Sequence, residues 1–186
     1  MKKILNLLPL LLLLILVACN NKTETTKEDT TGNNLTGGQE AVKDDESKPD
    51  VVKVAVGSKD HTTLVAALKQ AELVTSLSNA GPFTVFAPIN AAFDKLPAGT
   101  VDNLMKDENK ADLQNILQYH VTTSALKPDF FKDGQTLGMV NGDNITISIK
   151  DGKVVLNNSA TIVASIQASN GMVHVIDGVL LPPAKK

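Results

Sequence analysis

The chain has 186 residues with a formal net charge of −2, and 42% of its residues are hydrophobic while only 3% are aromatic. All 18 basic residues are lysine, so the chain lacks the guanidinium fork that reads phosphates and guanine edges, and its acidic balance repels polyanions. We therefore expect no nucleic-acid partner. Cys19 is the only cysteine, which excludes a disulfide within one chain.

The first 18 residues are typical of a bacterial signal peptide. Lys2 and Lys3 precede an apolar run over residues 4–17, which is too short to span a hydrocarbon layer of about 30 Å. The run ends in Leu16-Val17-Ala18-Cys19, which matches the bacterial lipobox. We predict residues 1–18 to be removed and Cys19 to receive diacylglycerol and a further acyl chain such as palmitate, which together anchor a protein stably. The alternative is an unmodified thiol near an ordinary cleavage site.

Residues 19–49 are predicted to be the lipidated cysteine and a disordered tether. From Asn20 to Pro49 the composition shifts to Asn, Thr, Lys, Glu, Asp and Gly, which cannot bury a core. Seven acidic residues outnumber four lysines in this tether, so it should stand away from an anionic lipid surface. Asn20, where an aspartate would signal retention in the inner membrane, favours the outer membrane or the cell surface.

Residues 50–186 are about the size of one ordinary domain. Valines over 51–56 predict a first strand, and a helix is predicted to begin at Asp60. The apolar residues that recur at helical spacing in this helix are Leu64, Val65, Leu68 and Ala71. A short helical turn is predicted over 73–77.

The stretch 81–93 is the centre of the predicted fold. Phe83 to Ala87 is an apolar run between the turn pair Gly81-Pro82 and Pro88, which indicates a buried strand. Asn90 is predicted to cap the next helix by accepting one of its early backbone N–H groups. Two further helices are predicted to begin at Thr100 and near Asp107.

The second half of the domain changes to the pattern of strands. Extended segments are predicted over 119–122, 135–140, 145–149, 154–156, 161–168 and 172–181. Asp151-Gly152 is a hairpin signal between two of them. A helical first half and a mainly hairpin-connected second half indicate an α+β fold.

The histidines His61, His120 and His174 have no cysteine or second histidine at metal-site spacing. His120 and His174 lie in predicted apolar strands, so we expect core residues satisfied by hydrogen bonds; the alternative is a ligand or pH-sensing role. His61, near a helix start, is expected at the surface. No nucleophile elbow or phosphate loop occurs in the sequence. We therefore expect no metal, no cofactor, no catalytic residue and no enzyme activity.

Three separated motifs, in this order, closely resemble the fasciclin domain: the stretch 81–93, the pair Tyr119-His120, and the segment 168–183 with its Asn170-Gly171 turn. The resemblance covers Val51 to Pro183. It implies a fasciclin-like fold, with a helical first half packed on a wedge-shaped β-sandwich and the outer two motifs as neighbouring central strands. It also implies a non-catalytic adhesion or matrix module that binds other proteins or glycans.

The resemblance carries over to single residues. Tyr119 and His120 match a pair that the family links to adhesion, although an aromatic residue and a histidine in an apolar segment usually pack in the core. Asn170, Gly171 and His174 match a motif that we interpret as structural. In some animal members an acidic residue shortly before the Asn-Gly turn is tied to integrin binding, but residues 164–167 contain no acid, which opposes integrin-type recognition.

These observations predict a lipid-anchored adhesion or interaction module outside the cytoplasm. Its partners would be the lipid bilayer, through acylated Cys19, and an unidentified protein or glycan; the chain is expected to be a monomer. The alternative is an envelope protein that binds a small ligand or glycan in a concave apolar pocket. The absence of Trp and the single Tyr weaken sugar stacking and favour protein contacts.

The strands at 83–87 and 173–177 carry apolar side chains on both faces. Only a strand covered on both sides has this pattern. We therefore predict that the two strands are adjacent in the centre of the fold, with helices on one side and the hairpins of the second half on the other.

Overall fold

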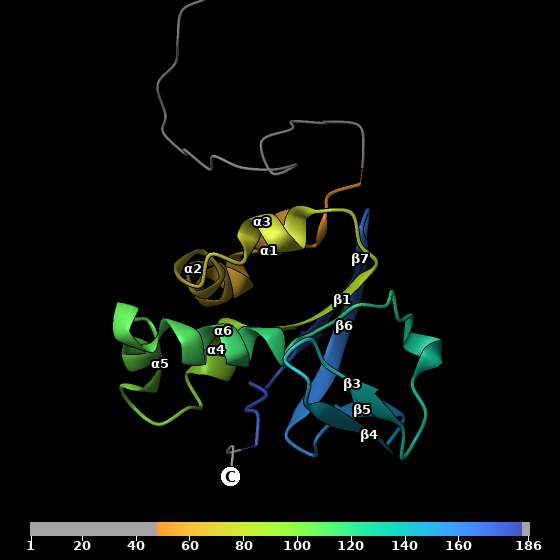
Figure 1. The fold of residues 1–186 in the computed structure, drawn as a ribbon. Helices are drawn as coiled ribbons and strands as arrows, with labels where there is room; N and C mark the ends of the chain where they lie inside the picture. The colour runs from red at the N-terminus through yellow and green to blue at the C-terminus, as the bar shows by residue number, and fades with distance from the viewer. Residues whose placement is uncertain (1–47, 184–186) are drawn as a thin grey trace, which may run out of the picture. The chain divides into compact units, whose positions relative to one another are not determined.

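The structure is a computed structural model and describes residues 48–183. The predicted signal peptide, Cys19 and most of the predicted tether lie outside the described residues. Helices fill the first half of the described part (Figure 1). The α-helices are α1 (Val51–Val56), α2 (Thr62–Gln70), α3 (Val74–Ser78), α4 (Asn90–Phe93), α5 (Thr100–Leu104) and α6 (Lys110–Gln118). Short 3-10 helices are η2 (Lys59–His61), η3 (Asp107–Asn109) and η4 (Pro128–Phe130).

The strands form one mixed sheet in the order β2-β1-β7-β6-β5-β4-β3. Their bounds are β1 (Phe83–Pro88), β2 (Val121–Thr122), β3 (Thr136–Gly138), β4 (Asn144–Lys150), β5 (Lys153–Leu156), β6 (Ala160–Ala168) and β7 (Gly171–Ile176). The parallel pair is β1 with β7, in register from Phe83 opposite Gly171 to Pro88 opposite Ile176. The predicted adjacency of these two strands, and the α+β fold with N-terminal helices on a sheet, are confirmed.

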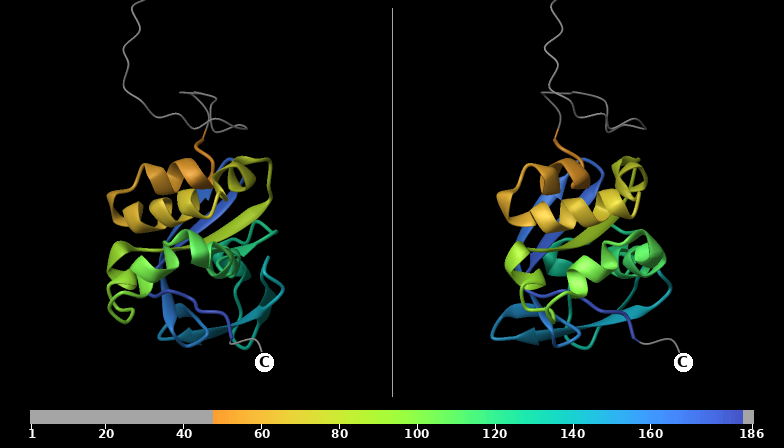
Figure 2. Two further views of the ribbon diagram at one scale, coloured as in Figure 1. Left: turned by 60° about the vertical axis from the view of Figure 1, so that its left-hand side comes forward. Right: turned by 90° about the vertical axis from the view of Figure 1, so that its left-hand side faces the viewer.

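The β1–β7 pair separates two hydrophobic clusters because successive side chains of a strand point to opposite faces. Val85 and Ala87 of β1 and Val173 of β7 pack with buried aliphatic residues of α1, α2, α3 and α6. Phe86 of β1 and Ile176 of β7 pack instead with residues of the second-half strands and loops. Figure 2 shows the first helices, coloured orange to yellow, on one side of these strands and the later strands, coloured cyan and blue, on the other.

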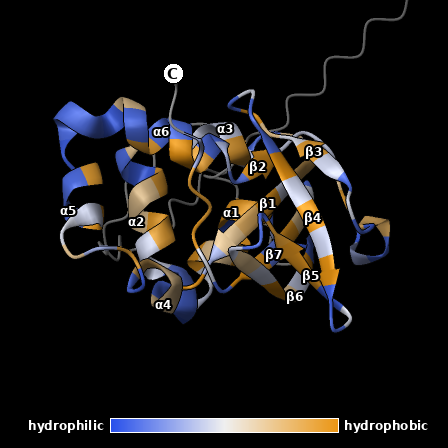
Figure 3. Ribbon diagram, turned by 90° about the horizontal axis from the view of Figure 1, so that it is seen from below, coloured by the Kyte–Doolittle hydropathy of each residue, from blue (hydrophilic) through white to orange (hydrophobic). Residues whose placement is uncertain are grey.

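The β4–β5 hairpin follows its sequence signal. Asp151 and Gly152 have φ values of 49° and 73°, the left-handed region that an Asp-Gly turn favours. Ile145 and Ile147 of β4 are fully buried while Asn144 and Thr146 beside them are exposed, and Figure 3 shows apolar and paler segments alternating along β4. This strand therefore covers the core with one face.

The valine-rich segment 51–56 is a helix, so the prediction of a first strand was wrong. Asp50 caps this helix, since its Oδ1 accepts the Lys53 N–H at 2.8 Å. Val51, Val52 and Ala55 are buried on the face turned to the core. Burial of that face, together with the cap, outweighs the strand preference of β-branched residues, which depends strongly on context.

Asn90 caps a helix, but not the helix that the sequence predicts. It is the first residue of α4, and no side chain caps that helix. Its Oδ1 accepts the Thr63 N–H at 3.1 Å and the Thr62 hydroxyl at 3.2 Å, while its Nδ2 donates to the Lys59 carbonyl at 3.0 Å. Asn90 therefore satisfies the N-terminus of α2 from a distant part of the chain, an arrangement that local spacing cannot predict.

Candidate interaction surface

Tyr119 and His120 lie at the junction of α6 and β2, and both side chains are buried. The predicted extended segment 119–122 is a strand only at Val121 and Thr122, because Tyr119 is the C-cap of α6 and His120 lies in the turn after it. The Tyr119 hydroxyl donates to the Asn144 carbonyl at 2.9 Å and accepts the Asn157 Nδ2–H at 2.8 Å. The pair therefore joins elements of the core and offers no exposed surface.

Both ring nitrogens of His120 have partners. Nδ1 lies 2.8 Å from the Ile116 carbonyl, which can only accept, and Nε2 lies 3.0 Å from the Leu180 N–H, which can only donate. The ring is therefore neutral with its proton on Nδ1. Burial lowers the pKa of His120 from 6.5 to about 4, and the Ile116 carbonyl opposes the shift.

His61 is buried, so its predicted place at the surface was wrong. Its Nδ1 lies 2.8 Å from the Ser58 hydroxyl, whereas its buried Nε2 has no hydrogen-bond partner among the described residues. Burial lowers the pKa of His61, and the Ala87 backbone and the Asp60 carboxylate oppose this shift without reversing it. The short η2 segment turns the ring inward, a direction that the position near a helix start does not reveal.

Asn170 and Gly171 hold the strand pair and the first helices together. The loop between β6 and β7 is Ser169-Asn170, and Gly171 is already paired in β7, where a Cβ would meet the Phe83 carbonyl oxygen at 1.9 Å. Gly171 thus permits the close approach of β1, in place of the turn role that the sequence indicates. The Asn170 Oδ1 accepts the Val51 N–H at 2.9 Å, and its Nδ2 donates to the carbonyls of Leu77 and Asn79.

His174 of β7 supports the base of the loop after β2. Its Nε2–H donates to the Leu126 carbonyl at 2.8 Å, and its Nδ1 accepts the Ser165 hydroxyl at 2.7 Å. The imidazole stacks on Phe86, with ring centres 5.6 Å apart, and meets the edge of Phe131 at 5.1 Å. Burial lowers the pKa of His174, and the Leu126 carbonyl opposes the shift.

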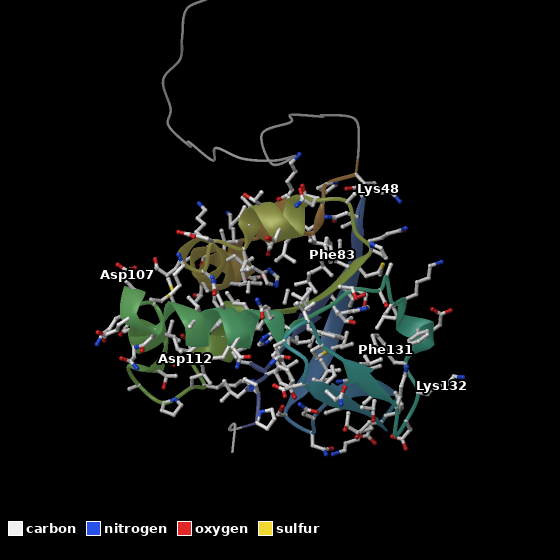
Figure 4. All side chains as sticks on the ribbon, viewed as in Figure 1. Lys48, Phe83, Asp107, Asp112, Phe131 and Lys132 are labelled. Atoms are coloured by element: carbon white, nitrogen blue, oxygen red, sulfur yellow. The ribbon has the colours of Figure 1, made fainter. Side chains whose placement is uncertain are left out.

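Thr84 of β1 also bonds this loop, at Ser124 and Leu126. Its hydroxyl donates to the Ser124 carbonyl at 2.5 Å and accepts the Leu126 N–H at 2.8 Å. Leu126 and Phe131 are buried in the cluster on the strand side, so both ends of the segment between them are fixed. Figure 4 shows Phe131 on the inner side of this loop and Lys132 at its outer margin.

The fixed loop carries an open hollow that we name the 125–135 groove. It has a volume of about 770 Å³, and its lining residues are Ala125, Lys127, Asp129, Phe130, Lys132, Asp133, Gly134 and Gln135. All but Gln135 are exposed, and the Phe130 side chain is 48% exposed. Protein interfaces favour aromatic residues at their centre and place polar groups at the rim, and Phe130 with the two lysines and two aspartates around it has that arrangement.

The groove is the candidate binding feature that the sequence analysis missed. Its signal is the pair Phe130-Phe131 within a segment rich in Lys, Pro, Asp and Gly, because adjacent residues of a short turn rarely both point inward. A second hollow of about 360 Å³ lies beside it, shares Ala125 and Lys127, and continues to residues 167–172. The first hollow is lined by surface residues and the second mostly by surface residues, with only Ala168 and Met172 buried, whereas a small-ligand site encloses most of its ligand.

We also searched residues 48–183 for a metal site, an enclosed ligand cavity and a membrane-spanning helix. Within this range no group of three His, Cys, Asp or Glu residues is placed to hold a metal ion. An apolar cavity beside His120, Pro88 and Leu181 has a volume of about 30 Å³, about the share of one liquid water molecule. None of the described helices is both long and apolar enough to cross a bilayer.

Helices on a mixed sheet with a parallel β1–β7 centre define the architecture, and the buried Tyr119, His120 and His174 define its core. The chain belongs to the fasciclin domain family, whose model matches residues 59–182. Fasciclin domains are typically non-catalytic adhesion modules. The fold agrees with that of a FAS1 domain pair from the insect cell adhesion molecule Fasciclin I, with a TM-score of 0.64 and 17% identity over 73% of this chain and 52% of that chain.

Two bacterial relatives are closer in sequence than this solved structure. Protein sll1483 of Synechocystis is 48% identical over 138 residues, which are 74% of this chain and 76% of that protein. The cell surface glycolipoprotein MPB83 of Mycobacterium bovis is 40% identical over 129 residues, which are 67% of this chain and 56% of that protein.

Proposed function

We propose that this chain is a lipid-anchored adhesion or interaction module of a bacterial envelope, which binds a protein or matrix partner without catalysis. The lipobox at residues 16–19 supports the anchor, and so does the similarity to a relative named as a cell surface glycolipoprotein. Acyl chains on Cys19 hold the mature chain at the outer membrane or the cell surface. Residues 20–49 then separate the domain from the lipid, with a root-mean-square reach on the order of 30 Å.

The observation that carries the binding part of the proposal is the 125–135 groove. Phe130 presents an apolar ring there, and Lys127, Lys132, Asp129 and Asp133 present charges of both signs around it. Such a surface suits a partner with an apolar centre and a mixed polar rim. The Tyr119-His120 pair is buried and offers a partner almost no surface, so its part in adhesion is to support the fold.

The anchor is tested by Cys19→Ala, because no thioether can form without the thiol. We expect the variant to leave the membrane fraction or to persist as uncleaved precursor, and fractionation with metabolic palmitate labelling measures both. Normal processing and acylation of the variant would refute the lipobox assignment.

The binding surface is tested by capturing envelope proteins on the full-length chain purified from membranes. Phe130→Ala should remove the bound partner while the melting temperature stays unchanged. Leu181→Ala is the matched control, since its side chain is 52% exposed against 48% for Phe130 and lies outside the groove. Equal capture by Phe130→Ala and wild type would exclude the groove as the contact surface.

A further inference from the structure

β6 has an open edge over most of its length. On one side it pairs with β7 from Ile162 to Ala168. On the other side β5 reaches only Ala160 and Thr161. Residues 163–167 are all exposed, with Val163 at 57% and Ile166 at 41%. We name this stretch, Val163 to Gln167, the β6 edge.

The other edges of the sheet are short. β2 has two residues, and its Val121 carbonyl accepts the Val140 N–H at 2.8 Å. β3 has three residues. Proteins usually block longer edges with charged side chains, because an open edge pairs with any extended segment. The β6 edge has no such charge: between Lys153 and Asp177 the single ionisable side chain is the buried His174.

Both ends of the β6 edge are defined by the structure. A bulge between Ile162 and Ala164 interrupts the register at one end. At the other end the Ser169 N–H donates to the Pro49 carbonyl at 3.0 Å, and the Lys48 ammonium lies 3.5 Å from the Gln167 Oε1. Lys48 is visible in Figure 4 beside this end of the sheet. Only about five residues are therefore free to pair.

We propose that the β6 edge binds the β6 edge of a second copy of this chain, as an antiparallel pair about a two-fold axis. An isologous pair places each residue against a residue of the same segment, so a segment with charges would meet its own charges. Over residues 48–183 the chain carries 11 lysines and 13 acidic residues, yet none lies on this edge. Pairing also covers the exposed Val163 and Ile166.

The shortness of the edge sets the strength of the pairing. Five paired residues bury far less than the roughly 1,200–2,000 Å² of a stable interface. The chain is therefore a monomer in dilute solution, as the sequence predicts, and pairs where copies are concentrated. Concentration on a membrane rests on the proposed lipid anchor, whereas the geometry of the pair does not.

The test is disulfide trapping of the full-length chain in detergent at high protein concentration. In a Cys19→Ala background, the variants Ala164→Cys, Ile166→Cys and Gln167→Cys each carry a single thiol. We expect at least one to form disulfide-linked dimers about tenfold more than Thr146→Cys, because a paired geometry raises the effective concentration. Thr146 is exposed on β4, whose two edges are both paired. Because the anchor is absent, the outcome is independent of the proposed lipidation.

A charge at the edge gives the second measurement. Adding Ile166→Lys to the Ala164→Cys chain should reduce dimers to the level of Thr146→Cys. Adding Ile149→Lys, at an isoleucine that is 39% exposed on β4, should leave them unchanged. Dimers that form equally at Thr146, that fail to form at every edge position, or that survive Ile166→Lys would overturn the proposal. In cells, an adduct with a different protein in place of the dimer would also overturn it.

Discussion

Two neighbouring stretches of this chain use their polar groups in opposite ways. In Tyr119-His120 the hydroxyl and both ring nitrogens are bonded inside the protein. In the 125–135 groove, a few residues later, the lysines, the aspartates and Phe130 face solvent. The conspicuous sequence motif supports the fold, whereas the proposed contact surface lies in a loop that Thr84 and His174 hold in place.

Removing the His120 imidazole from the buried Tyr119-His120 pair should have the largest effect on the free energy of unfolding. His120→Ala deletes a buried ring and leaves the Leu180 N–H without its partner, while the Ile116 carbonyl keeps only the Tyr119 N–H at 3.1 Å. We expect a loss of about 2 to 4 kcal/mol in the free energy of unfolding. Denaturant unfolding measures it. A variant that unfolds like wild type but no longer captures a partner would instead make the pair a binding site.

Lowering the pH should reduce the free energy of unfolding by a comparable amount, through protonation of His120. The unfolded His120 binds a proton near pH 6.5, while burial delays this in the folded chain to a pKa of about 4. Between these values the unfolded state binds more protons, so stability falls as the pH falls from 6.5 to 4. The loss from this residue is about 3 kcal/mol, and nearly all of it arises below pH 6.5.

The lowered pKa values of His61 and His174 act in the same direction. His120→Asn therefore should flatten the dependence of unfolding free energy on pH without abolishing it. An unchanged slope between pH 6.5 and 4 in this variant would show that His120 already titrates normally in the folded chain.

A milder substitution at Tyr119 separates the stabilisation contributed by the hydroxyl from that contributed by the ring. Tyr119→Phe keeps the packing of the ring and removes the oxygen that bonds Asn144 and Asn157. We expect a loss of about 1 to 2 kcal/mol, because the Asn144 carbonyl is left without this donor. Chemical denaturation at pH 7 measures the change, and a loss of zero would mean that water replaces the hydroxyl without cost.

The smallest effect on stability is expected in the groove. Phe130→Ala removes an exposed ring and leaves the buried Leu126 and Phe131 in place, so the free energy of unfolding should change by less than about 0.5 kcal/mol. Its effect should appear in partner capture instead. A loss of several kcal/mol would show that the ring packs against the domain and is no free contact.

The sequence predicts those features that depend on neighbours along the chain. Apolar residues on both faces of 83–87 and 173–177 locate the central strands, and Asp151-Gly152 locates a hairpin. Prediction from the sequence is wrong where contacts with a distant segment determine the structure. The valines of α1 form a helix because Asp50 caps it and the core covers it, and Asn90 caps a helix that lies earlier in the chain.

In the candidate site, too, neighbours along the chain predict some features and distant segments determine the others. The buried state of His120 and His174 is predictable from their apolar surroundings, whereas their partners Leu180, Leu126 and Ser165 come from separate elements. The 125–135 groove depends on which of two adjacent phenylalanines points inward. That choice is made by Phe86 and His174, which pack against Phe131.

The most direct test of the structural role of Tyr119-His120 is an NMR titration of the imidazole of His120, one of three in the chain. A neutral ring with its proton on Nδ1 should persist as the pH is lowered from 7 to 5, with an apparent pKa of about 4. An imidazole that protonates near pH 6.5 in the folded chain would lie in solvent, and the assignment of this pair to the core would be wrong.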